Sequence, residues 1–589
     1  MHTIGLHWGD YCAMAIYMVA VVLLGLKFSK HEDNSEDYLL GGRNIPWIAV
    51  GISCLMSLLS TYSLVMIPSE IYNNGLSLWM LDLLMPVMAV MAFMLFVRFY
   101  FKLNAFTPFE YLERRYDKNV RVLVASIYSY VRILYLAMVL FATSKVFEGG
   151  AGWPPWVTIL VVGIIGILYT VMGGMRAVVW TDVLQFFVLI GGLGVAVIVL
   201  CMKVDHGFWG AVTYAIDHGH GAGKFANLSF YTCNPYVRLS FWLILISRVL
   251  GPMTQGASDQ ITIQRLLSTN SYKSAFKAMV TSSCLTVPFT LILWFIGLAI
   301  FSFYSQNPDP AVTGDTAFFK FISTQLPVPI PGLIMAAMLA AVMSTLDSGI
   351  NSMSAIWLKE FHLQYIRRDI PDKEQVKISR YATFAVGTIS VVLGIAIVYS
   401  SSWLGQSVVE AATIFTAFEV IIFPAFLFAV LSRRANSSLI WIMAGLLWGI
   451  KFGMVTWYVI TKRVAHSWTP GEALGLGGAI SYIWILVPTL IFVVLMAIWS
   501  IKYFAQHKKV VWLLATALFP AGYTYSMILW YYYSNTTVSD KPLGLSFQWV
   551  GFPVFIILFV VGFIALYLSP RQPARKWSGL TIWDANSAE

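Results

Sequence analysis

The most constraining feature of this sequence is a succession of apolar runs that begins at Tyr11 and continues almost to the C-terminus. A helix that crosses a bilayer needs about 20 mostly apolar residues, and segmentation on that length gives about fifteen candidate spans. Only 11% of the residues are charged, whereas soluble domains carry about 25%. We therefore predict an all-α polytopic membrane protein with about fourteen or fifteen spans, centred near residues 18, 57, 90, 133, 164, 190, 248, 288, 340, 388, 418, 448, 490, 522 and 558.

The net charge of +10 comes from short clusters of Lys and Arg between the apolar runs. With the N-terminus outside and fifteen spans, most of these clusters fall on one side of the bilayer. Cytoplasmic loops carry such an excess of Lys and Arg. We therefore expect a multi-pass protein of the plasma (cell inner) membrane, with its N-terminus outside and its C-terminus in the cytoplasm. The lipid bilayer is then the partner rather than nucleic acid, and we expect the chain to function as a monomer.

Two of the apolar runs carry helix-breaking signals. The run at 48–66 contains Gly51 and five hydroxyl residues and is expected to stop before Pro68, and the run at 238–256 is expected to break at Gly251-Pro252. Proline removes a backbone donor and clashes with the preceding turn. Interrupted spans in corresponding positions of two halves indicate an inverted-repeat transporter with its binding site near the membrane midplane. The alternative is two ordinary kinks in packed helices.

A third apolar run contains the stretch AAVMSTLDSG at 340–349. On a helix, Ala341, Ser344, Thr345 and Ser348 share one face, and Asp347 lies at its edge. Hydroxyl and carboxylate oxygens, completed by carbonyls of a broken helix, suit an alkali cation, and Na⁺ is the ion we expect. Alternatively, the hydroxyls bond back to their own helix, and Asp347 pairs with a Lys or Arg.

Other charged residues lie deep in apolar runs. Asp182 follows Gly173-Gly174, which lets the chain turn sharply. Asp182 is then either a second cation ligand, or a relay on the exit path of the ion. Alternatively, it is an acidic residue at the start of a helix near the membrane interface. Asp82 and Arg132 are flanked by apolar residues on both sides. If they pair, the pocket is near neutral and suits a sugar; if Arg132 is unpaired, it suits an anion.

Two further cations, Arg248 and Lys451, have no evident partner in the sequence. For both we expect a side chain that reaches toward the membrane surface.

The sequence contains no HExxH, no GxSxG and no pair of His at metal-binding spacing, so we predict that the protein is not an enzyme. Na⁺-driven symport of a small solute is the favoured function. A proton-coupled carrier or an ion channel that uses the same carboxylates remains the alternative.

Six stretches of the sequence form a recognisable set of motifs: EDYLLGGRNIPW (36–47), IPSEIYNNGL (67–76), FTPFEYLERRYDKNVRVL (106–123), YTVMGGMRAVVWTDVLQ (169–185), SDQITIQRLLS (258–268) and AAVMSTLDSG. They resemble motifs of the sodium:solute symporter family, which includes sodium–glucose, sialic acid, iodide and monocarboxylate carriers. The match runs in order from about residue 8 to residue 435. Two of these stretches, at 67–76 and 258–268, look most like the iodide, monocarboxylate and vitamin carriers.

The resemblance implies a leucine-transporter-type fold of five helices and an inverted five, preceded by one helix. It divides the chain into an N-terminal span and loop (1–45), a first repeat (46–205), a second repeat (206–435) and about four extra spans (436–589). It also implies Na⁺ as the transported ion. The main sodium site would consist of the backbone of Met56 and Leu59 together with Ala341, Ser344 and Thr345.

A second sodium site, found in some members of the family, would use Asp182, Ser344, Asp347 and Ser348. Asp347 departs from the hydroxyl expected at its position and adds charge to that site. The solute is expected to be a sugar, a sialic acid or a monocarboxylate, but Leu58 and Met85 stand where sugar carriers have polar groups. The candidate solute-binding residues are Ser60, Ser63, Asp82, Arg132, Asp259 and Gln260.

Overall fold

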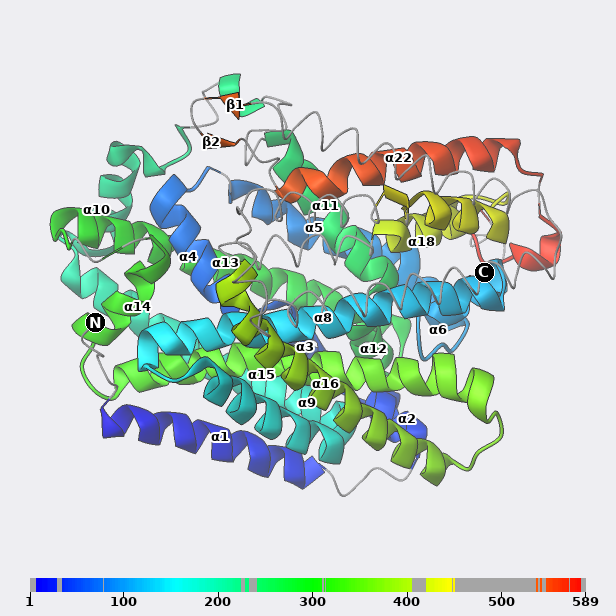
Figure 1. Cartoon of the computed structure of the whole chain (residues 1–589), viewed down its shortest axis with the longest axis horizontal. Helices are drawn as coiled ribbons and strands as arrows, with labels where there is room; N and C mark the ends of the chain where they lie inside the picture. The colour runs from blue at the N-terminus through cyan, green and yellow to red at the C-terminus, as the bar shows by residue number, and fades with distance from the viewer. Residues whose placement is uncertain are drawn as a thin grey trace, which may run out of the picture. The chain divides into compact units, whose positions relative to one another are not determined.

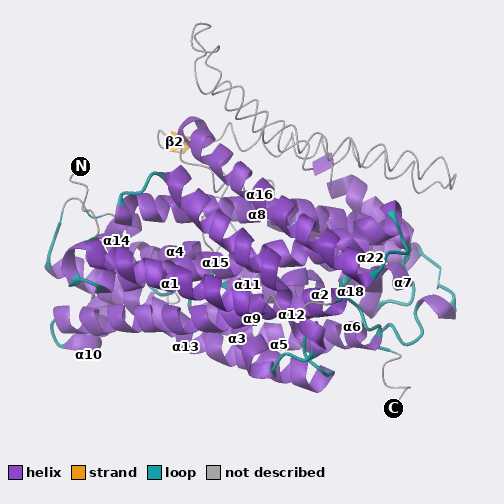
Figure 2. Ribbon diagram, turned by 90° about the horizontal axis from the view of Figure 1, so that it is seen from below, coloured by secondary structure: helices purple, strands orange, loops and turns teal. Residues whose placement is uncertain are grey.

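The structure is a computed structural model of the 589-residue chain. It describes residues 7–28, 34–77, 79–223, 228–231, 241–309, 312, 314–404, 420–447, 449–450, 537–538, 541–542, 547–570 and 572–583. Almost all of this part is helical (Figure 2). Its strands are two residues long: β1 (Thr537–Val538) pairs antiparallel with β2 (Lys541–Pro542). The predicted spans centred near 490 and 522, and Lys451, lie outside the described residues.

The longer helices are α1 (Trp8–Phe28), α3 (Trp47–Leu58), α4 (Thr61–Asn74), α5 (Met85–Ala92), α8 (Lys118–Ala151), α9 (Pro155–Lys203), α10 (Gly207–Ala215), α11 (Phe241–Ser258), α12 (Gln260–Leu267), α13 (Tyr272–Gln306), α14 (Gly314–Gln325), α15 (Ile330–Ile356), α16 (Asp372–Leu404), α18 (Ile422–Leu431) and α22 (Phe547–Leu568). Shorter helices are α2 (Ser35–Leu40), α6 (Arg98–Lys102) and α7 (Phe109–Arg115). Short 3₁₀ or π segments are η2 (Gly41–Arg43), η3 (Met80–Leu84), η4 (Phe93–Val97), η5 (Ile216–His220), η7 (Leu228–Tyr231), η8 (Trp357–Ile366) and η11 (Ala574–Lys576).

The spans predicted near residues 18, 90, 133, 164, 190, 288, 340 and 388 fall within helices that could cross a bilayer. Seven described helices are long and apolar enough to cross a bilayer, or eight if the bent pair Ser35–Arg43 and Trp47–Leu58 counts as one span. At about 1.5 Å per residue, the 49-residue helix α9 is too long for one span of roughly 30 Å. It bends at Gly174, where φ is 50° and ψ is −153°, so the sharp turn predicted at Gly173-Gly174 is confirmed.

Two expected helix ends are wrong. Helix α4 continues through Pro68 to Asn74, and α11 continues through Gly251 and Pro252 to Ser258. A proline deletes one backbone hydrogen bond, and packed neighbours in a membrane protein can satisfy the freed group without unwinding the helix. The interruption of the run at 48–66 is real, however, and lies at Leu59-Ser60, between α3 and α4.

The chain divides into two compact units. The first contains Met1–Pro108, Leu136–Thr232 and Ile244–Ile395. Its centre is α15, which packs along α9 and α1 (Figure 1). Every residue from Ile334 to Ile356 is buried, so the polar face at 341–348 is turned into the protein and away from lipid.

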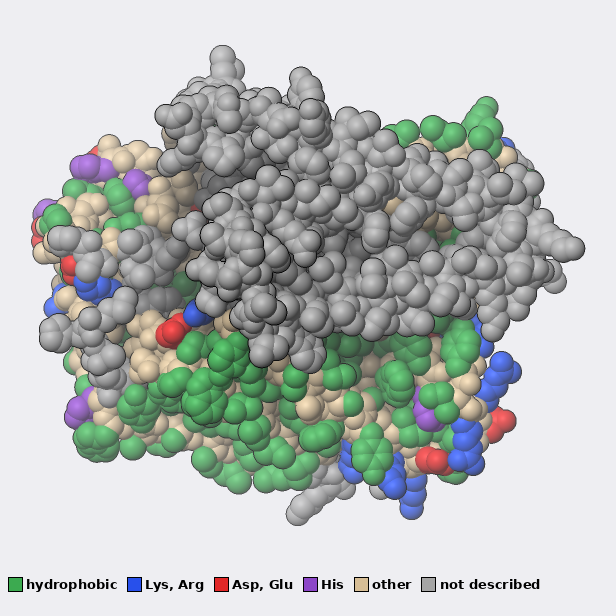
Figure 3. Space-filling view, viewed as in Figure 1, with side chains coloured by type: hydrophobic (Ala, Val, Ile, Leu, Met, Phe, Trp, Pro, Cys, Tyr) green, Lys and Arg blue, Asp and Glu red, His purple; other side chains and the backbone are tan. Residues whose placement is uncertain are grey.

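The outer face of the first unit is apolar (Figure 3). Exposed aliphatic and aromatic side chains on this unit include Ile16 and Leu23 of α1, Ile164 and Leu168 of α9, and Phe384 and Ile389 of α16. Lys and Arg side chains gather at one end of the face in Figure 3. Arg367, Arg368, Lys373 and Lys377, between α15 and α16 or at the start of α16, are all exposed. This separation of apolar belt and basic end fits a membrane-embedded unit.

The second unit contains Phe109–Tyr135, Cys233–Leu243 and Ala396–Glu589. Within it, the buried Arg115 donates to the carbonyls of Ala429 at 2.7 Å and Lys576 at 2.6 Å. Tyr111 donates to the carbonyl of Leu580 at 2.7 Å. These bonds attach α7 to α18 and to the segment after α22.

Candidate functional site

The site is organised around the break in the first interrupted span. Helix α3 ends at Leu58, and both Leu59 (φ −93°, ψ 122°) and Ser60 (φ −116°, ψ 160°) are extended. Ser60 is a favourable residue at the start of a helix, and its hydroxyl accepts from the Ser63 amide at 3.3 Å to begin α4. The Met56 carbonyl accepts from the Leu59 amide at 3.1 Å, and the carbonyl oxygens at this end of α3 lie at the negative end of its dipole.

Thr345 of α15 lies directly against this break. Its Oγ1 donates toward the carbonyl oxygen of Leu59 at 2.9 Å and toward that of Ala341 at 3.1 Å. Thr345 is 1% exposed, and Met56 and Ala341 are fully buried. The Leu59 carbonyl, in the break after α3, and the Ala341 carbonyl of α15 thus both lie within hydrogen-bond distance of the Thr345 hydroxyl.

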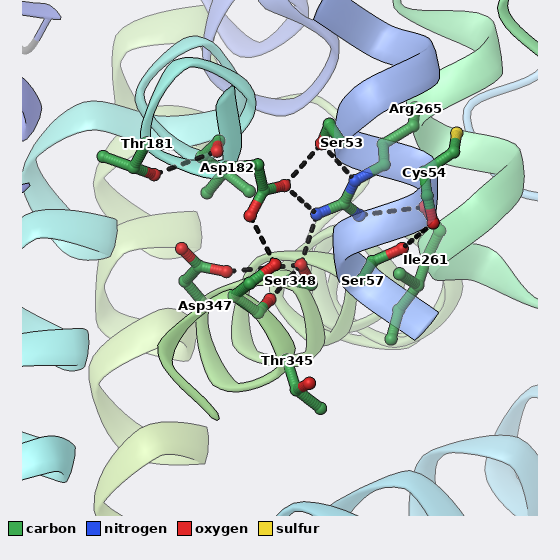
Figure 4. Close-up of polar contacts among 12 residues, drawn as sticks. Ser53, Cys54, Ser57, Thr181, Asp182, Ile261, Arg265, Thr345, Asp347 and Ser348 are labelled. Carbon is green, nitrogen blue, oxygen red and sulfur yellow. Dashed lines mark hydrogen bonds and ion pairs between the residues drawn. The ribbon is translucent and has the colours of Figure 1, made fainter. Parts of the chain in front are cut away.

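A second polar cluster surrounds Asp182 of α9 (Figure 4). Its Oδ1 accepts from the Ser344 hydroxyl at 2.5 Å, and its Oδ2 accepts from the Ser53 hydroxyl, also at 2.5 Å. Asp182 is 0% exposed. The cluster therefore links α9 to α3 and α15, and Ser344 belongs to it as well as to the face that carries Thr345.

Arg265 of α12 supplies the cation of this cluster. Its guanidinium forms an ion pair with Asp182 at 3.1 Å, donates to Ser53 Oγ at 2.7 Å and also donates to Ser348 Oγ. Arg265 is 1% exposed. Its side chain therefore points into the protein, where it gives Asp182 a buried counter-charge.

Asp347 is the second buried carboxylate. Its Oδ2 accepts from the Tyr169 hydroxyl at 2.7 Å, and its Oδ1 lies 3.2 Å from Ser348 Oγ. No Lys or Arg within 4 Å pairs with it in the part of the chain that the structure describes. Asp182 and Asp347 thus place two buried carboxyl groups near one buried guanidinium, that of Arg265.

Asp82 forms an ion pair with Arg248 of α11. This corrects two expectations: Asp82 does not take Arg132 as its partner, and Arg248 does not simply reach toward the membrane surface. The Arg248 guanidinium carbon also lies 5.3 Å from the centre of the Trp79 ring. A partner brought in from a distant helix cannot be recognised from local sequence, and Arg132 was the nearer choice along the chain.

Comparison with known proteins identifies the family. The model of the sodium:solute symporter family matches residues 38–453. The chain belongs to this family. It is 27% identical over 439 residues to the sodium/sialic acid symporter SiaT of Proteus mirabilis, covering 73% of this chain and 86% of the relative. It is also 25% identical over 451 residues to the human sodium-coupled monocarboxylate transporter 1, covering 74% and 72% respectively.

A solved structure supports the fold. It is a Na⁺-coupled sialic acid symporter described as substrate-bound and outward-open, with a TM-score of 0.67 and 24% identity, covering 81% of this chain and 96% of that one. This symporter therefore has the fold of that carrier. Membership of the family makes the chain a membrane transporter rather than an enzyme, with sodium as the coupling ion.

The donor groups of this symporter fit Na⁺. The α3 carbonyls and the hydroxyls of Ser344 and Thr345 are hard oxygen ligands, and such half-helix carbonyls bind Na⁺ in transporters. Among the described residues, no group of three or more His, Cys, Asp or Glu side chains could hold a metal ion.

The remaining predicted solute residues are dispersed. Arg132 belongs to the second unit, where its guanidinium carbon lies 5.1 Å from the Tyr128 ring and 5.4 Å from the Tyr135 ring. Asp259 accepts from the Thr262 amide and hydroxyl at 3.2 and 2.9 Å and thereby begins α12. Gln260 donates to the carbonyl of Phe106 at 3.1 Å. These contacts favour structural roles for Asp259 and Gln260.

Three residues around Asp182 and Asp347 were not found by sequence reasoning: Ser53, Tyr169 and Arg265. Two of them had a signal, because Tyr169 and Arg265 stand in motifs that resemble the family. Ser53 had no signal beyond being a polar residue in an apolar run.

Proposed function

We propose that this Na⁺-coupled symporter imports a small polar or anionic organic solute by alternating access. The solute classes under consideration are sugars, sialic acids and monocarboxylates. Ser60, Ser63, Asp82 and Arg132 remain the proposed solute-binding residues, and Asp259 and Gln260 are retained only as untested candidates. The membrane is the plasma (cell inner) membrane.

The observation that carries this proposal is the contact between Thr345 Oγ1 and the carbonyl oxygen of Leu59. A Na⁺ ion bound by Met56, Leu59, Ala341, Ser344 and Thr345 would join the broken α3–α4 segment to α15. An ion shifts a conformational equilibrium only if it binds the two states differently. An ion that bridges two helices meets that condition, because separation of the helices removes its ligands.

The available energy suits uphill uptake. One Na⁺ moving inward through 100 mV releases about 2.3 kcal/mol, and a tenfold concentration gradient adds about 1.4 kcal/mol. Together these support a solute gradient of roughly 500-fold per ion. The number of ions therefore determines how far the solute can be concentrated.

We further propose a second Na⁺ site at Asp182, Ser344, Asp347 and Ser348. The carboxyl oxygens of Asp182 and Asp347, with the hydroxyls of Ser344 and Ser348 beside them, support a cation there. Arg265 already donates to Asp182 and Ser348, so the ion must share these ligands with the guanidinium or displace it.

The architecture that accompanies this proposal is the five-plus-five inverted repeat. Its halves are residues 46–205 and 206–435, the preceding span is in 1–45, and 436–589 carries the additional spans and the cytoplasmic tail. The N-terminus is outside, and the chain works as a monomer.

Uptake into proteoliposomes with an imposed Na⁺ gradient tests the function. The full-length protein is screened with a labelled sialic acid, glucose, butyrate and proline. The double variant Ser344→Ala/Thr345→Ala should raise the half-saturating Na⁺ concentration about tenfold or more, because two ligand oxygens are lost. Ser354→Ala is the matched control, since this buried hydroxyl of α15 bonds only within its own helix, to the carbonyl of Asn351 at 2.8 Å.

An unchanged Na⁺ dependence in the double variant would count against the main site. Uptake that follows an imposed pH gradient and ignores Na⁺ would point instead to a proton-coupled carrier. Current that exceeds any plausible carrier turnover would point to a channel.

A further inference from the structure

We propose that residues 207–221, which contain α10 and η5 and are called the outer arm below, brace α4 and thereby tune the affinity for Na⁺. His220 is then a positioning residue of the main sodium site. This inference rests on the proposed symport function. The outer arm lies at the end of the first unit that carries the N-terminus (Figure 1), and the proposed function places that end outside.

His220 bonds the outer arm to the last turn of α4. Its Nε2 lies 2.9 Å from the carbonyl oxygen of Tyr72, and a carbonyl can only accept, so this nitrogen carries a proton and donates. The His220 carbonyl accepts from the Leu76 amide at 2.8 Å. The last carbonyls of a helix have no partner within it, so His220 supplies one of the bonds that end α4.

The chain after α4 fits the outer arm closely. Gly75 has φ 77° and ψ −176°, a conformation that essentially only glycine adopts. A Cβ on Gly75 would lie 2.8 Å from the His220 Cα. Ser77, which is 1% exposed, donates to the Gly221 carbonyl at 2.8 Å. The contact between the outer arm and α4 is therefore a specific junction at which the two backbones meet.

The outer arm is anchored on α13. Ser302 of α13 donates to the Ala211 carbonyl of α10 at 2.7 Å. The His220 ring stacks on the ring of Phe301, also of α13, with the two centroids 3.5 Å apart. The arm thus contacts α13 at both α10 and η5. Movement of the end of α4 away from α13 would break the bonds that His220 and Ser77 make.

Helix α13 also holds both halves of the broken span. A Cβ on Gly51 of α3 would lie 2.8 Å from the Ala278 carbonyl oxygen of α13. A Cβ on Gly297 of α13 would lie 2.7 Å from the Ile71 Cβ of α4. The extended break at Leu59 stands between these two contacts. The angle between α3 and α4, and with it the direction of the Leu59 carbonyl, therefore depends on what fixes α4 to α13.

This angle connects the outer arm to sodium. The Leu59 carbonyl lies 2.9 Å from Thr345 Oγ1 in the structure, in which the arm holds α4. If α4 moves more freely, a smaller fraction of the molecules presents that carbonyl. The apparent dissociation constant for Na⁺ then rises by the same factor. Coupling between two sites is reciprocal, so bound Na⁺ should in turn keep α4 on the outer arm.

Hydrogen exchange tests the junction in the purified full-length protein. Mass spectrometry follows the peptide that contains the Leu76 amide, which donates to the His220 carbonyl. Na⁺, compared with choline at the same ionic strength, should slow exchange of this amide about fivefold or more. A peptide from α16 reports any general stabilisation and should slow less. Exchange at Leu76 that is unchanged, or slowed no more than in α16, would overturn the coupling.

Variants of the junction test the affinity itself, with Na⁺ as the titrant in isothermal calorimetry. His220→Ala should raise the dissociation constant for Na⁺ about fivefold, because a hydrogen bond that fixes α4 is lost. Ser77→Ala removes a separate bond of the same junction and should act in the same direction. His220→Gln keeps an N–H donor on a side chain of similar length and should restore most of the affinity.

The matched control is His218→Ala. His218 is exposed, and its Nδ1 lies 2.8 Å from the Tyr214 carbonyl of the arm itself, so this variant should bind Na⁺ as the wild type does. Thermal unfolding in choline measures stability separately from Na⁺ affinity. A lower unfolding midpoint in His220→Ala and Ser77→Ala with an unchanged dissociation constant would refute the brace.

Failure of the proposed function gives a different result. The wild-type protein would then show no calorimetric Na⁺ binding, and Na⁺ would drive no uptake of labelled sialic acid, glucose, butyrate or proline. Na⁺ binding and Na⁺-driven uptake in the wild type, with an unchanged affinity for Na⁺ in both junction variants, refute the brace alone.

Discussion

Removing the cation from the cluster around Asp182 should make the protein less stable but more responsive to Na⁺. In the variant Arg265→Gln, the carboxylates of Asp182 and Asp347 face each other's charge with no guanidinium between them. Breaking a buried ion pair by removing one partner costs about 3–5 kcal/mol. Arg265 and Asp182 qualify for that range, because their side chains are 1% and 0% exposed.

Bound Na⁺ should restore part of the free energy of unfolding that Arg265→Gln loses. Arg265 occupies Asp182 and Ser348, two of the four groups proposed for the second ion. Without the guanidinium, Na⁺ meets no competitor there. At a concentration 100 times its dissociation constant, a ligand stabilises the folded state by about 2.7 kcal/mol. We therefore expect a larger Na⁺-dependent stabilisation in Arg265→Gln than in the wild type, and a smaller one in Asp182→Asn.

The assay is thermal unfolding of the purified full-length protein across a Na⁺ titration, with choline replacing Na⁺ at constant ionic strength. Arg367→Gln is the control: it breaks an exposed ion pair with Glu374 at 3.3 Å, whose side chains are 62% and 42% exposed. Such pairs contribute about 0–1 kcal/mol, so neither the stability nor the Na⁺ response should change. A Na⁺ response in Arg265→Gln that is equal to or below that of the wild type would refute the competition between guanidinium and sodium.

Two further substitutions test the contacts and the backbone bend that position Asp347 and Asp182. Tyr169→Phe should destabilise the protein by about 1.5–3 kcal/mol, because the 2.7 Å bond to Asp347 is lost; an unchanged unfolding midpoint would contradict this. Gly174→Ala should prevent folding, measured as a loss of monodisperse protein, because φ 50° with ψ −153° suits only glycine. Gly191→Ala on the same helix meets no atom within 4 Å and should be tolerated; equal yields of the two variants would show that the kink is not required.

Much of the fold could be predicted because the membrane imposes one length on every span. Apolar runs near 20 residues long predicted α1, α8, α13, α15 and α16 in order. Local chemistry also located the bend of α9 at Gly173-Gly174. It indicated that the run at 48–66 is interrupted, but it placed the end before Pro68 rather than at Leu59-Ser60.

Other features could not be predicted from the sequence, because they depend on tertiary contacts. Pro68 and Pro252 lie inside continuous helices, since whether a proline ends a helix is decided by its neighbours in space. The partners of Asp82 and Asp182 come from α11 and α12, far away in the sequence. A carboxylate in an apolar run predicts that a counter-charge lies nearby, but the sequence does not indicate which Lys or Arg supplies it.

Ser344 determines whether the two proposed sodium ions act independently. A serine hydroxyl has one proton and two acceptor lone pairs. In the structure its proton is directed to Asp182 Oδ1 at 2.5 Å, which leaves the lone pairs available for an ion beside Thr345. An ion placed between Ser344 and Asp182 would displace that proton and reorient the hydroxyl. If both ions bind as proposed, the charge state of the Asp182 cluster and the occupancy of the main site are linked through the rotation of one hydroxyl, and binding of either ion should change the affinity for the other.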